Sequence, residues 1–179
     1  MIRIALWLLG GGLLGGIVHL TTVLWLPDLA TQDAYSRLTP VAPVNAVSAV
    51  PAPTPDKSVV PFLDPAFAMA VCRYDLTDGP LKFSVPVSPA YTSVSFYTRN
   101  DVAYYAINDR AAGRRVIELE LMTTEQRGEL PGDEEVTAAD RLIVESPTLT
   151  GLIIIKALAP EPGMMPAAQT ALTAAKCVQ

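Results

Sequence analysis

The hydrophobic pattern divides the chain into two regions. From Ile4 to Leu26 the sequence is continuously apolar or small and contains no Asp, Glu, Lys or Arg. A helix rises about 1.5 Å per residue, so a helix over this run just crosses a hydrocarbon core of about 30 Å. Trp7 and Trp25 lie near its ends, where amphipathic rings favour the headgroup zone. The run therefore predicts a single membrane-spanning anchor, which we place at residues 1–28.

The flanks of the run predict its orientation. Arg3 precedes it, whereas Asp28 and Asp33 follow it. Because positive flanks stay on the cytoplasmic side, we expect everything after Leu26 to lie on the far side of the membrane. A cleaved signal peptide is the alternative, but no small-x-small cleavage site follows Trp25 and the run is longer than a usual signal core. We therefore favour an uncleaved signal-anchor.

Two overlapping GxxxG patterns occur inside the anchor. They are formed by Gly11, Gly12, Gly15 and Gly16. Residues four apart share a helix face, so these glycines predict one flat side that a partner helix or a second copy of the chain can approach closely. The alternative is that glycine is simply frequent in membrane helices. His19 lies in the same span without a second ligand, and we expect a neutral imidazole in a hydrogen bond there.

Between residues 39 and 65 the pattern is neither helical nor alternating. Prolines occur at positions 40, 43, 51, 53, 55, 61 and 65, separated mostly by Ala, Val, Ser and Thr. Such segments favour an extended, semi-rigid spacer. We therefore predict a Pro/Ala-rich linker at residues 29–61, with a short interfacial helix over 29–38, and a folded domain at residues 62–179.

In the folded domain, apolar and polar residues alternate with period two. Runs of this kind predict strands at residues 70–76, 81–87, 92–97, 102–107, 115–122, 141–145 and 150–158. Pro86 predicts an edge strand or a broken ladder in the second run, and the Ile-rich last run predicts a central strand buried on both faces. An Ala-rich helix is expected at 166–176. About seven short strands without intervening helices predict a mainly β fold, an antiparallel β-sandwich.

Cys72 and Cys177 are the two cysteines of the chain, and both follow the anchor. An oxidising compartment is expected there, so we predict a disulfide between them, with two separate buried thiols as the alternative. Closing a loop of about 105 residues stabilises a domain by several kcal/mol on the chain-entropy model.

The candidate chemistry is sparse. The net charge is −5, and no basic patch suits a nucleic acid. The single histidine lies in the anchor, so we expect no Ser-His or Cys-His catalytic pair, no metal cluster and no cofactor. Glu118 and Glu120 alternate as any solvated strand face does. Four tyrosines cluster near the third and fourth strands; some of them must belong to the core, and an exposed subset is expected to form a contact surface for another protein. The four are Tyr91, Tyr97, Tyr104 and Tyr105.

Three stretches support a family resemblance. They are Arg73-Tyr74-Asp75-Leu76 with Gly79-Pro80, the strand Tyr91 to Tyr97, and Ser146-Pro147 leading to Gly151 and the Ile-rich strand. The region from Phe62 to Cys177 resembles the domain-of-unknown-function 1254 family (DUF1254), in the small membrane-anchored form found in alphaproteobacteria. The resemblance implies an immunoglobulin-like β-sandwich and no catalytic residues. It also implies a bacterial inner-membrane location with the domain in the periplasm.

Longer relatives in that family continue into a second domain of unknown function, of the 1214 type. We therefore expect a membrane-anchored envelope component that binds a companion-domain protein, or itself, rather than a complete enzyme. The alternative is a subunit of an enzyme or of a small-molecule-binding complex whose site a partner completes.

Overall fold

The structure is a computed structural model that describes residues 2–29, 33–54, 56–129 and 142–179. The chain forms two compact units, residues 1–32 and residues 33–179. The first unit contains helix α1 (Ile2–Leu29), in which Ile2–Leu26 is long and apolar enough to cross a membrane. The hydroxyls of Thr21 and Thr22 donate to the carbonyls of Ile17 and Val18, both at 2.8 Å. These hydroxyls are thus satisfied within the helix, as an apolar surrounding requires.

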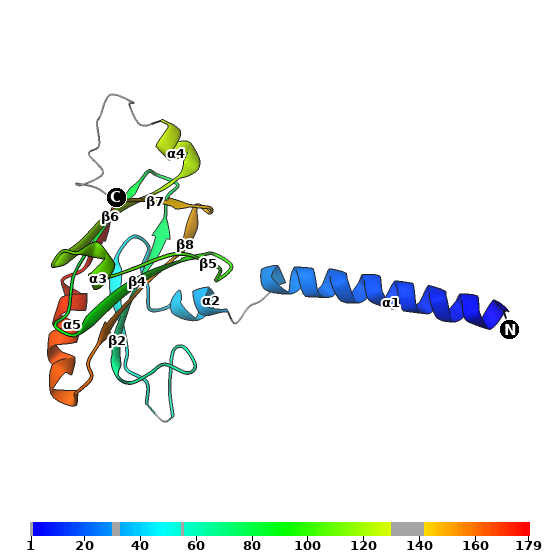
Figure 1. Cartoon of the computed structure of the whole chain (residues 1–179), viewed down its shortest axis with the longest axis horizontal. Helices are drawn as coiled ribbons and strands as arrows, with labels where there is room; N and C mark the ends of the chain where they lie inside the picture. The colour runs from blue at the N-terminus through cyan, green and yellow to red at the C-terminus, as the bar shows by residue number, and fades with distance from the viewer. Residues whose placement is uncertain (1, 30–32, 55, 130–141) are drawn as a thin grey trace. The chain divides into compact units, whose positions relative to one another are not determined.

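The second unit is a sandwich of two β-sheets (Figure 1). The first sheet, in the order β1-β2-β8-β4-β5, consists of β1 (Val47–Val50), β2 (Phe67–Asp75), β8 (Thr150–Leu158), β4 (Tyr91–Thr98) and β5 (Ala103–Asn108). The second, in the order β7-β6-β3-β9, consists of β7 (Leu142–Ser146), β6 (Val116–Thr123), β3 (Leu81–Pro86) and β9 (Lys176–Val178). The remaining helices are α2 (Ala34–Leu38), α3 (Asp109–Ala112), α4 (Thr124–Gly128), η1 (Pro162–Met164) and α5 (Met165–Thr173). The predicted mainly β sandwich with a short C-terminal helix is confirmed.

The main core lies between the two sheets. Because successive side chains on a strand point to opposite faces, one side of each alternating strand enters this core. Phe83 of β3 packs edge-on against Phe96 of β4, with ring centroids 6.3 Å apart. β8 is central, between β2 and β4, and it is buried on both faces as its Ile-rich sequence predicted. β3 lies between β6 and β9 and is therefore not an edge strand. Its ladder with β9 ends at Ser84, as the prediction of a broken ladder allowed, whereas its ladder with β6 continues to Pro86, opposite Val116.

The cysteines join the two sheets. Cys72 of β2 and Cys177 of β9 are both buried, lie at disulfide distance, and have Cα atoms 6.5 Å apart. The C-terminal helix ends earlier than predicted, at Thr173, because the chain then becomes strand β9 beside β3.

The sandwich is mixed rather than purely antiparallel. β6 and β7 pair in parallel, with Leu119 opposite Leu142 and Thr123 opposite Ser146. The connection between them, which the sequence predicts as a long acidic loop over 123–135, begins with α4. A capping box formed by Thr123 and Gln126 starts that helix. The rest of the loop, including the predicted Pro-Gly turn, lies outside the described residues.

A second, smaller core covers the outer face of the first sheet. Its buried residues are Leu38 of α2, Ala42, Val50 of β1, Met69, Val71 and Leu152, and the partly buried Val59, Val60 and Leu63 complete the cover. The prediction of an extended spacer is therefore wrong for the described part of this segment, and the compact unit already begins at Asp33. The physical reason is that a proline prevents regular secondary structure only at its own position in the chain. The proline-free stretch 44–50 provides β1, and the valines and leucines between the prolines bury apolar surface.

A buried hydroxyl cluster connects the two sheets at one end. The Tyr74 hydroxyl donates to the carbonyl of Tyr97 at 3.2 Å and lies 3.0 Å from the Ser146 Oγ. Tyr104 donates to the Tyr74 oxygen at 3.2 Å, and burial together with that neighbour raises the pKa of Tyr104. A Cβ at Gly151 would lie 2.3 Å from the Tyr74 oxygen, so only glycine admits the tyrosine here.

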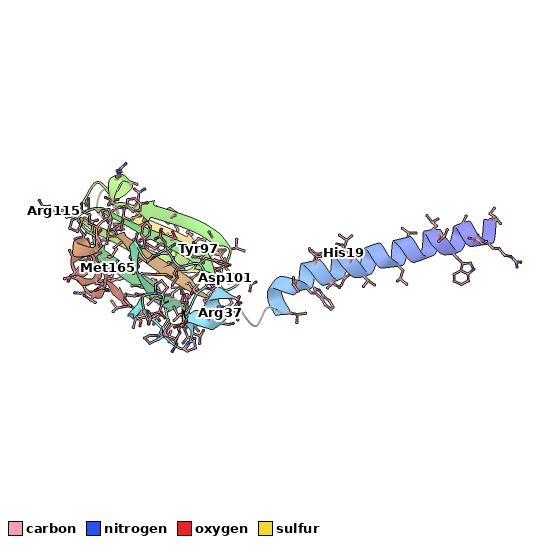
Figure 2. All side chains as sticks on the ribbon, turned by 90° about the horizontal axis from the view of Figure 1, so that it is seen from below. His19, Arg37, Tyr97, Asp101, Arg115 and Met165 are labelled. Carbon is pink, nitrogen blue, oxygen red and sulfur yellow. A yellow bond between two sulfur atoms is a disulfide. The ribbon has the colours of Figure 1, made fainter. Side chains whose placement is uncertain are left out.

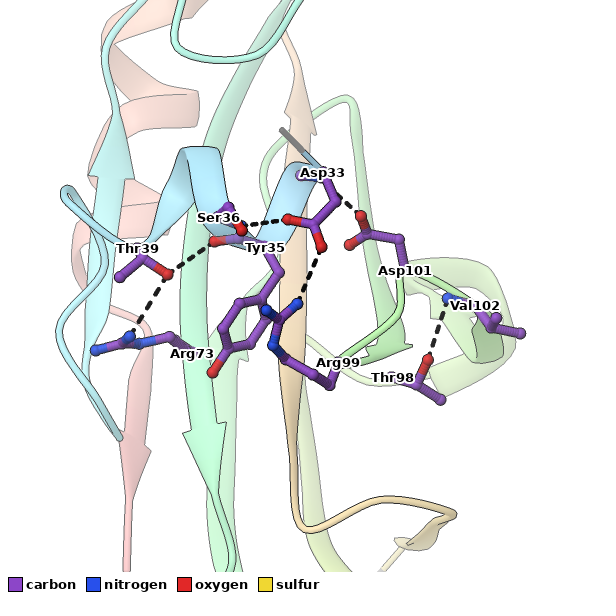
Figure 3. A network of polar contacts seen from close by, with 10 residues as sticks. Asp33, Tyr35, Ser36, Thr39, Arg73, Thr98, Arg99, Asp101 and Val102 are labelled. Atoms are coloured by element: carbon purple, nitrogen blue, oxygen red, sulfur yellow. Dashed lines mark hydrogen bonds and ion pairs between the residues drawn. The ribbon is translucent and has the colours of Figure 1, made fainter. Parts of the chain in front are cut away.

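The start of the unit is fixed to the β4–β5 hairpin (Figure 3). Asp33 caps α2 by accepting from the amide of Ser36 at 2.7 Å, and its second oxygen pairs with Arg99 at 3.0 Å. The Arg99 guanidinium lies 4.1 Å from the centre of the Tyr35 ring. Residues far apart in the sequence are thereby held together by a charge pair and a cation–π contact.

The two aspartates of this network have opposite pKa shifts. Burial raises the pKa of Asp33, but the hydrogen bonds from Ser36 and Arg99 outweigh it, and the pKa is lowered. The carboxylate of Asp101 accepts from the amide of Ala34 at 2.8 Å. Burial of Asp101 nevertheless raises its pKa, and the nearby charge of Asp33 adds to the rise.

Candidate ligand-binding groove

A groove of about 790 Å³ lies at one end of the first sheet. It is lined by the first sheet, including outer-face residues of β2, β4 and β8 that form its floor, by residues 49–53 and 62–65, and by α5. Volumes of 300–1,000 Å³ are typical of small-molecule sites, which are mostly apolar with a few polar groups. This groove has the same character.

Strand register sets the floor. Met69 of β2, Lys156 of β8 and Ser93 of β4 lie opposite one another in one row across three strands. In the next row on the same face, Phe67 and Tyr91 lie on either side of Leu158. Lys156 is therefore at the middle of the floor, between an apolar side chain and a hydroxyl.

The loop side carries an exposed aromatic residue. Phe62 lines the groove, is fully exposed to solvent, and has a φ of 60°. A bulky side chain rarely adopts this left-handed conformation, which costs of order 1–3 kcal/mol. Leu63 and Val60, on either side of the Pro61-Phe62 pair, pack into the second core. The loop is thus held in place by its neighbours while Phe62 stands out of it.

The helix side follows from the spacing of α5. Residues four apart lie on one face of a helix, and Met165, Gln169 and Thr173 all line the groove (Figure 2 labels Met165). Ala168 and Leu172 belong to the main core, and Leu172 also reaches the groove. One helix therefore closes the sandwich and forms a wall of the groove.

The groove contains one cation and one carboxylate in its described lining, Lys156 and Asp64. Asp64 is used locally, since its Oδ1 accepts from the amide of Ala66 at 2.9 Å and its carbonyl accepts from Phe67 at 3.1 Å. Within the described parts of the chain, no carboxylate lies within ion-pair distance of the Lys156 amine. Among the described residues, no carboxylate therefore compensates the positive charge of Lys156.

The four predicted contact tyrosines do not gather on one surface. Tyr91 lines the groove, and Tyr97 packs against the second core on the outer face of the sheet (Figure 2). Tyr104 and Tyr105 pack against the main core, where an irregularity in the β4–β5 pairing lets both reach Phe96. All four are partly buried.

The predicted residues of the anchor lie on α1. Nothing within the described residues comes within 4 Å of a Cβ built at Gly11, Gly12, Gly15 or Gly16. His19 lies on the same helix (Figure 2). No described group of three or more His, Cys, Asp or Glu side chains is arranged to hold a metal ion.

A second hollow of about 340 Å³ lies on the outer face of the second sheet. Its charged residues come from adjacent strands, with Lys82 opposite Glu120 and both Lys176 and Glu118 opposite Ser84. Opposite charges on neighbouring strands are what a solvated sheet face gives. The larger groove is the better candidate site.

The fold of the domain is shared with a solved structure of another protein. The fold is similar to the crystal structure of the VPA0106 protein from Vibrio parahaemolyticus, with a TM-score of 0.61 and 14% identity, over 83% of this chain and 34% of that one. A crystal structure of an uncharacterised protein from Burkholderia cenocepacia matches with a TM-score of 0.43 and 17% identity, over 66% of this chain and 33% of that one. This chain therefore spans about a third of the length of each. No curated protein matches it.

The family model "Protein of unknown function (DUF1254)" matches residues 44–179. The chain belongs to the DUF1254 family, as its sequence motifs suggested. The match begins within the segment expected to be a linker, which agrees with the inclusion of β1 in the sheet.

Proposed function

We propose that the protein is a membrane-anchored binding module whose ligand occupies the groove between residues 49–65 and α5. The observation that carries the proposal is a groove of about 790 Å³ with mainly apolar walls and, on its floor, a lysine that has no carboxylate partner among the described residues. An apolar concavity in water gains free energy, about 25 cal/mol per Å² of apolar surface, when a ligand covers it.

The backbone at Phe62 supports this proposal. A strained, fully exposed aromatic residue at the side of a groove contributes nothing evident to packing. Such outliers cluster at ligand-contact sites, where an occupant recovers their cost. Phe62 is placed to close over the apolar body of a ligand.

The groove favours one of the two functions that the sequence left open. A protein-contact surface built from Tyr91, Tyr97, Tyr104 and Tyr105 is less favoured, because these side chains are partly buried in three different places. A small-molecule-binding component fits the geometry better. We propose binding rather than catalysis, since the described lining offers a single carboxylate that already caps a turn.

The test uses the full chain in phosphatidylcholine nanodiscs and an alkyl diazirine probe, with crosslinked positions mapped by mass spectrometry. Crosslinks on α1 report the probe dissolved in the bilayer and serve as the internal reference. We expect additional crosslinks at residues 49–53 and 165–173. Gln169→Trp, which fills the groove, should remove them, whereas Ala167→Trp, on an exposed position of α5 outside the groove, should not. An equal groove-to-anchor ratio in the wild type and Gln169→Trp would refute the proposal.

We also propose that the anchor pairs with another helix, of a companion-domain protein or of a second copy. The glycine face of α1, formed by Gly11, Gly12, Gly15 and Gly16, supports this, since close approach of two backbones needs such a surface. Crosslinking in intact cells with a tagged chain should recover the partner. Changing the four glycines to Leu should abolish recovery, whereas Gly10→Leu, on a different part of the helix, should preserve it. Absence of any crosslinked partner would exclude the pairing.

For localisation we propose the bacterial inner membrane, with the N-terminus in the cytoplasm and the domain in the periplasm. Arg3 precedes the apolar helix, and the cysteine pair at disulfide distance suits an oxidising compartment. Labelling of a cysteine introduced at Val102, an exposed residue in the β4–β5 hairpin, would test this in intact spheroplasts. A membrane-impermeant maleimide should react there without lysis.

A further inference from the structure

We infer that the ligand of the groove is a monoanionic amphiphile, such as a long-chain carboxylate, whose anionic group is bound by Lys156. The inference rests on the proposed function and gives it a chemical class. It is carried by the position of one charged side chain and by the nature of the surfaces around it.

Lys156 is an exception on its strand. β8 is otherwise apolar around it, with Ile153, Ile154 and Ile155 before it and Ala157 after it. On the floor its nearest cross-strand neighbours are Met69 and Ser93, and neither is charged. Lys156 is an exposed residue, so water can solvate its ammonium group. A neutral apolar ligand would cover the charge without replacing that water, which is costly.

The surroundings of Lys156 suit an anion. The hydroxyls of Ser93 and Tyr91 occupy the same face, one in its own row and one in the next. Ser93 lies directly opposite Lys156, where Cβ atoms are about 5 Å apart, and Tyr91 is a diagonal neighbour at about 7–8 Å, within reach of an aromatic side chain. The ammonium and the two hydroxyls can therefore converge on one acceptor group. Their single positive charge matches a monoanion; recognition of a phosphate dianion usually takes an arginine cluster.

The remaining walls suit an apolar chain. Val50, Pro51 and Leu63 lie on the loop side, and Met165 and Leu172 lie on the helix side. Methionine side chains are flexible and adapt to ligands of varied shape. The groove is therefore complementary to a carboxylate with a long alkyl tail. Its cation on the floor matches the carboxylate, and the apolar surface leading away from the cation matches the tail.

The experiment measures competition against the diazirine probe with the full chain in nanodiscs, at a mildly alkaline pH where the carboxylate is ionised. The competitors are dodecanoate and the neutral dodecanol. In the wild type, dodecanoate should displace the groove crosslinks more effectively than dodecanol. Lys156→Met should weaken dodecanoate competition about fivefold, as expected for a partly solvated ion pair, and leave dodecanol unchanged or improved.

Two further variants make the result decisive. Lys82→Met, on the outer face of the second sheet, removes an equivalent strand lysine and should change neither competitor. Lys156→Arg keeps the cation and should keep the preference for dodecanoate, which preserves the test if Lys156→Met does not fold. If dodecanoate and dodecanol compete equally in the wild type and in Lys156→Arg, the anionic class is refuted while the groove remains a binding site. If no probe gives groove crosslinks above those of Gln169→Trp, the proposed function itself fails. Competition by a hydrophobic peptide but by neither small molecule would assign the groove to a protein partner and overturn the inference.

Discussion

Replacing Gly151 by alanine should destabilise the sandwich by about 2–5 kcal/mol, because the structure leaves no space for a side chain there. A Cβ at this position would lie 2.2 Å from the carbonyl oxygen of Tyr97 and 2.3 Å from the hydroxyl of Tyr74. Overpacking of this kind typically costs about 1–3 kcal/mol. The tyrosine must also shift, which weakens its hydrogen bonds to the Tyr97 carbonyl and to Ser146 and adds up to about 1 kcal/mol for each bond.

The measurement is the urea midpoint of the full chain in nanodiscs, followed by pulse proteolysis. Tryptophan fluorescence is unsuitable because both tryptophans, Trp7 and Trp25, lie in the anchor. Gly163→Ala is the matched control, since nothing lies within 4 Å of a Cβ built there. Combining Gly151→Ala with Tyr74→Phe should cost less than the sum of the single changes, because the second change removes one of the three clashing atoms, the Tyr74 hydroxyl oxygen. Equal midpoints for Gly151→Ala and Gly163→Ala would refute the reasoning.

The other predictions use the same unfolding assay. Arg99→Ala should lower the free energy of unfolding by about 1 kcal/mol at neutral pH, because it removes the ion pair with Asp33 and the stacking contact with Tyr35. Since the pKa of Asp33 is lowered in the folded state, this loss of stability should fade as the pH drops through the folded pKa. A loss that does not change with pH would contradict the prediction. Asp101→Asn should stabilise the domain at neutral pH by less than about 1 kcal/mol, because the raised folded pKa of Asp101 favours a neutral side chain. The gain should disappear in acid, where Asp101 itself is neutral. Asparagine tolerates the positive φ of 59° found at this position. Replacing Cys72 and Cys177 by serine should cost about 2–4 kcal/mol for a sequence separation of 105, and dithiothreitol should destabilise the wild type equally. An unchanged midpoint under reduction would show that the bond does not restrain the unfolded chain.

The sequence predicted most of the fold because its strands carry their own pattern. Alternation places β2 to β8 within a few residues of their observed bounds, and the uninterrupted isoleucines identify β8 as central. What it could not predict were pairings that depend on the completed sheet. β1 is only four residues long within a proline-rich segment, and β9 is three residues long after a helix. Their strand character comes from the edges of β2 and β3 on which they add.

The candidate site was less visible in the sequence than the fold. Lys156 is recognisable as a charge at the end of an apolar run, but its place between Met69 and Ser93 depends on register across three strands. Phe62 appears in the sequence as an ordinary apolar residue between Pro61 and Leu63, and only its backbone conformation makes it unusual. The site is assembled from residues far apart in the chain, so no local spacing of residues in the sequence predicts it.

The cysteine pair helps to hold one side of the groove in place. The helix side of the groove, α5, is only nine residues long, so its position depends on the segments at its two ends. Its start follows β8 through η1, and its end leads within a few residues into β9, where Cys177 is bound to Cys72 of the opposite sheet. Short β9, paired with β3 over three positions only, would hold the helix weakly by itself. The covalent link therefore fixes the wall that carries Gln169 and Leu172 against the floor that carries Lys156, and ligand retention should require the oxidised protein. The proposed binding would therefore suit the oxidising compartment that we propose for the domain.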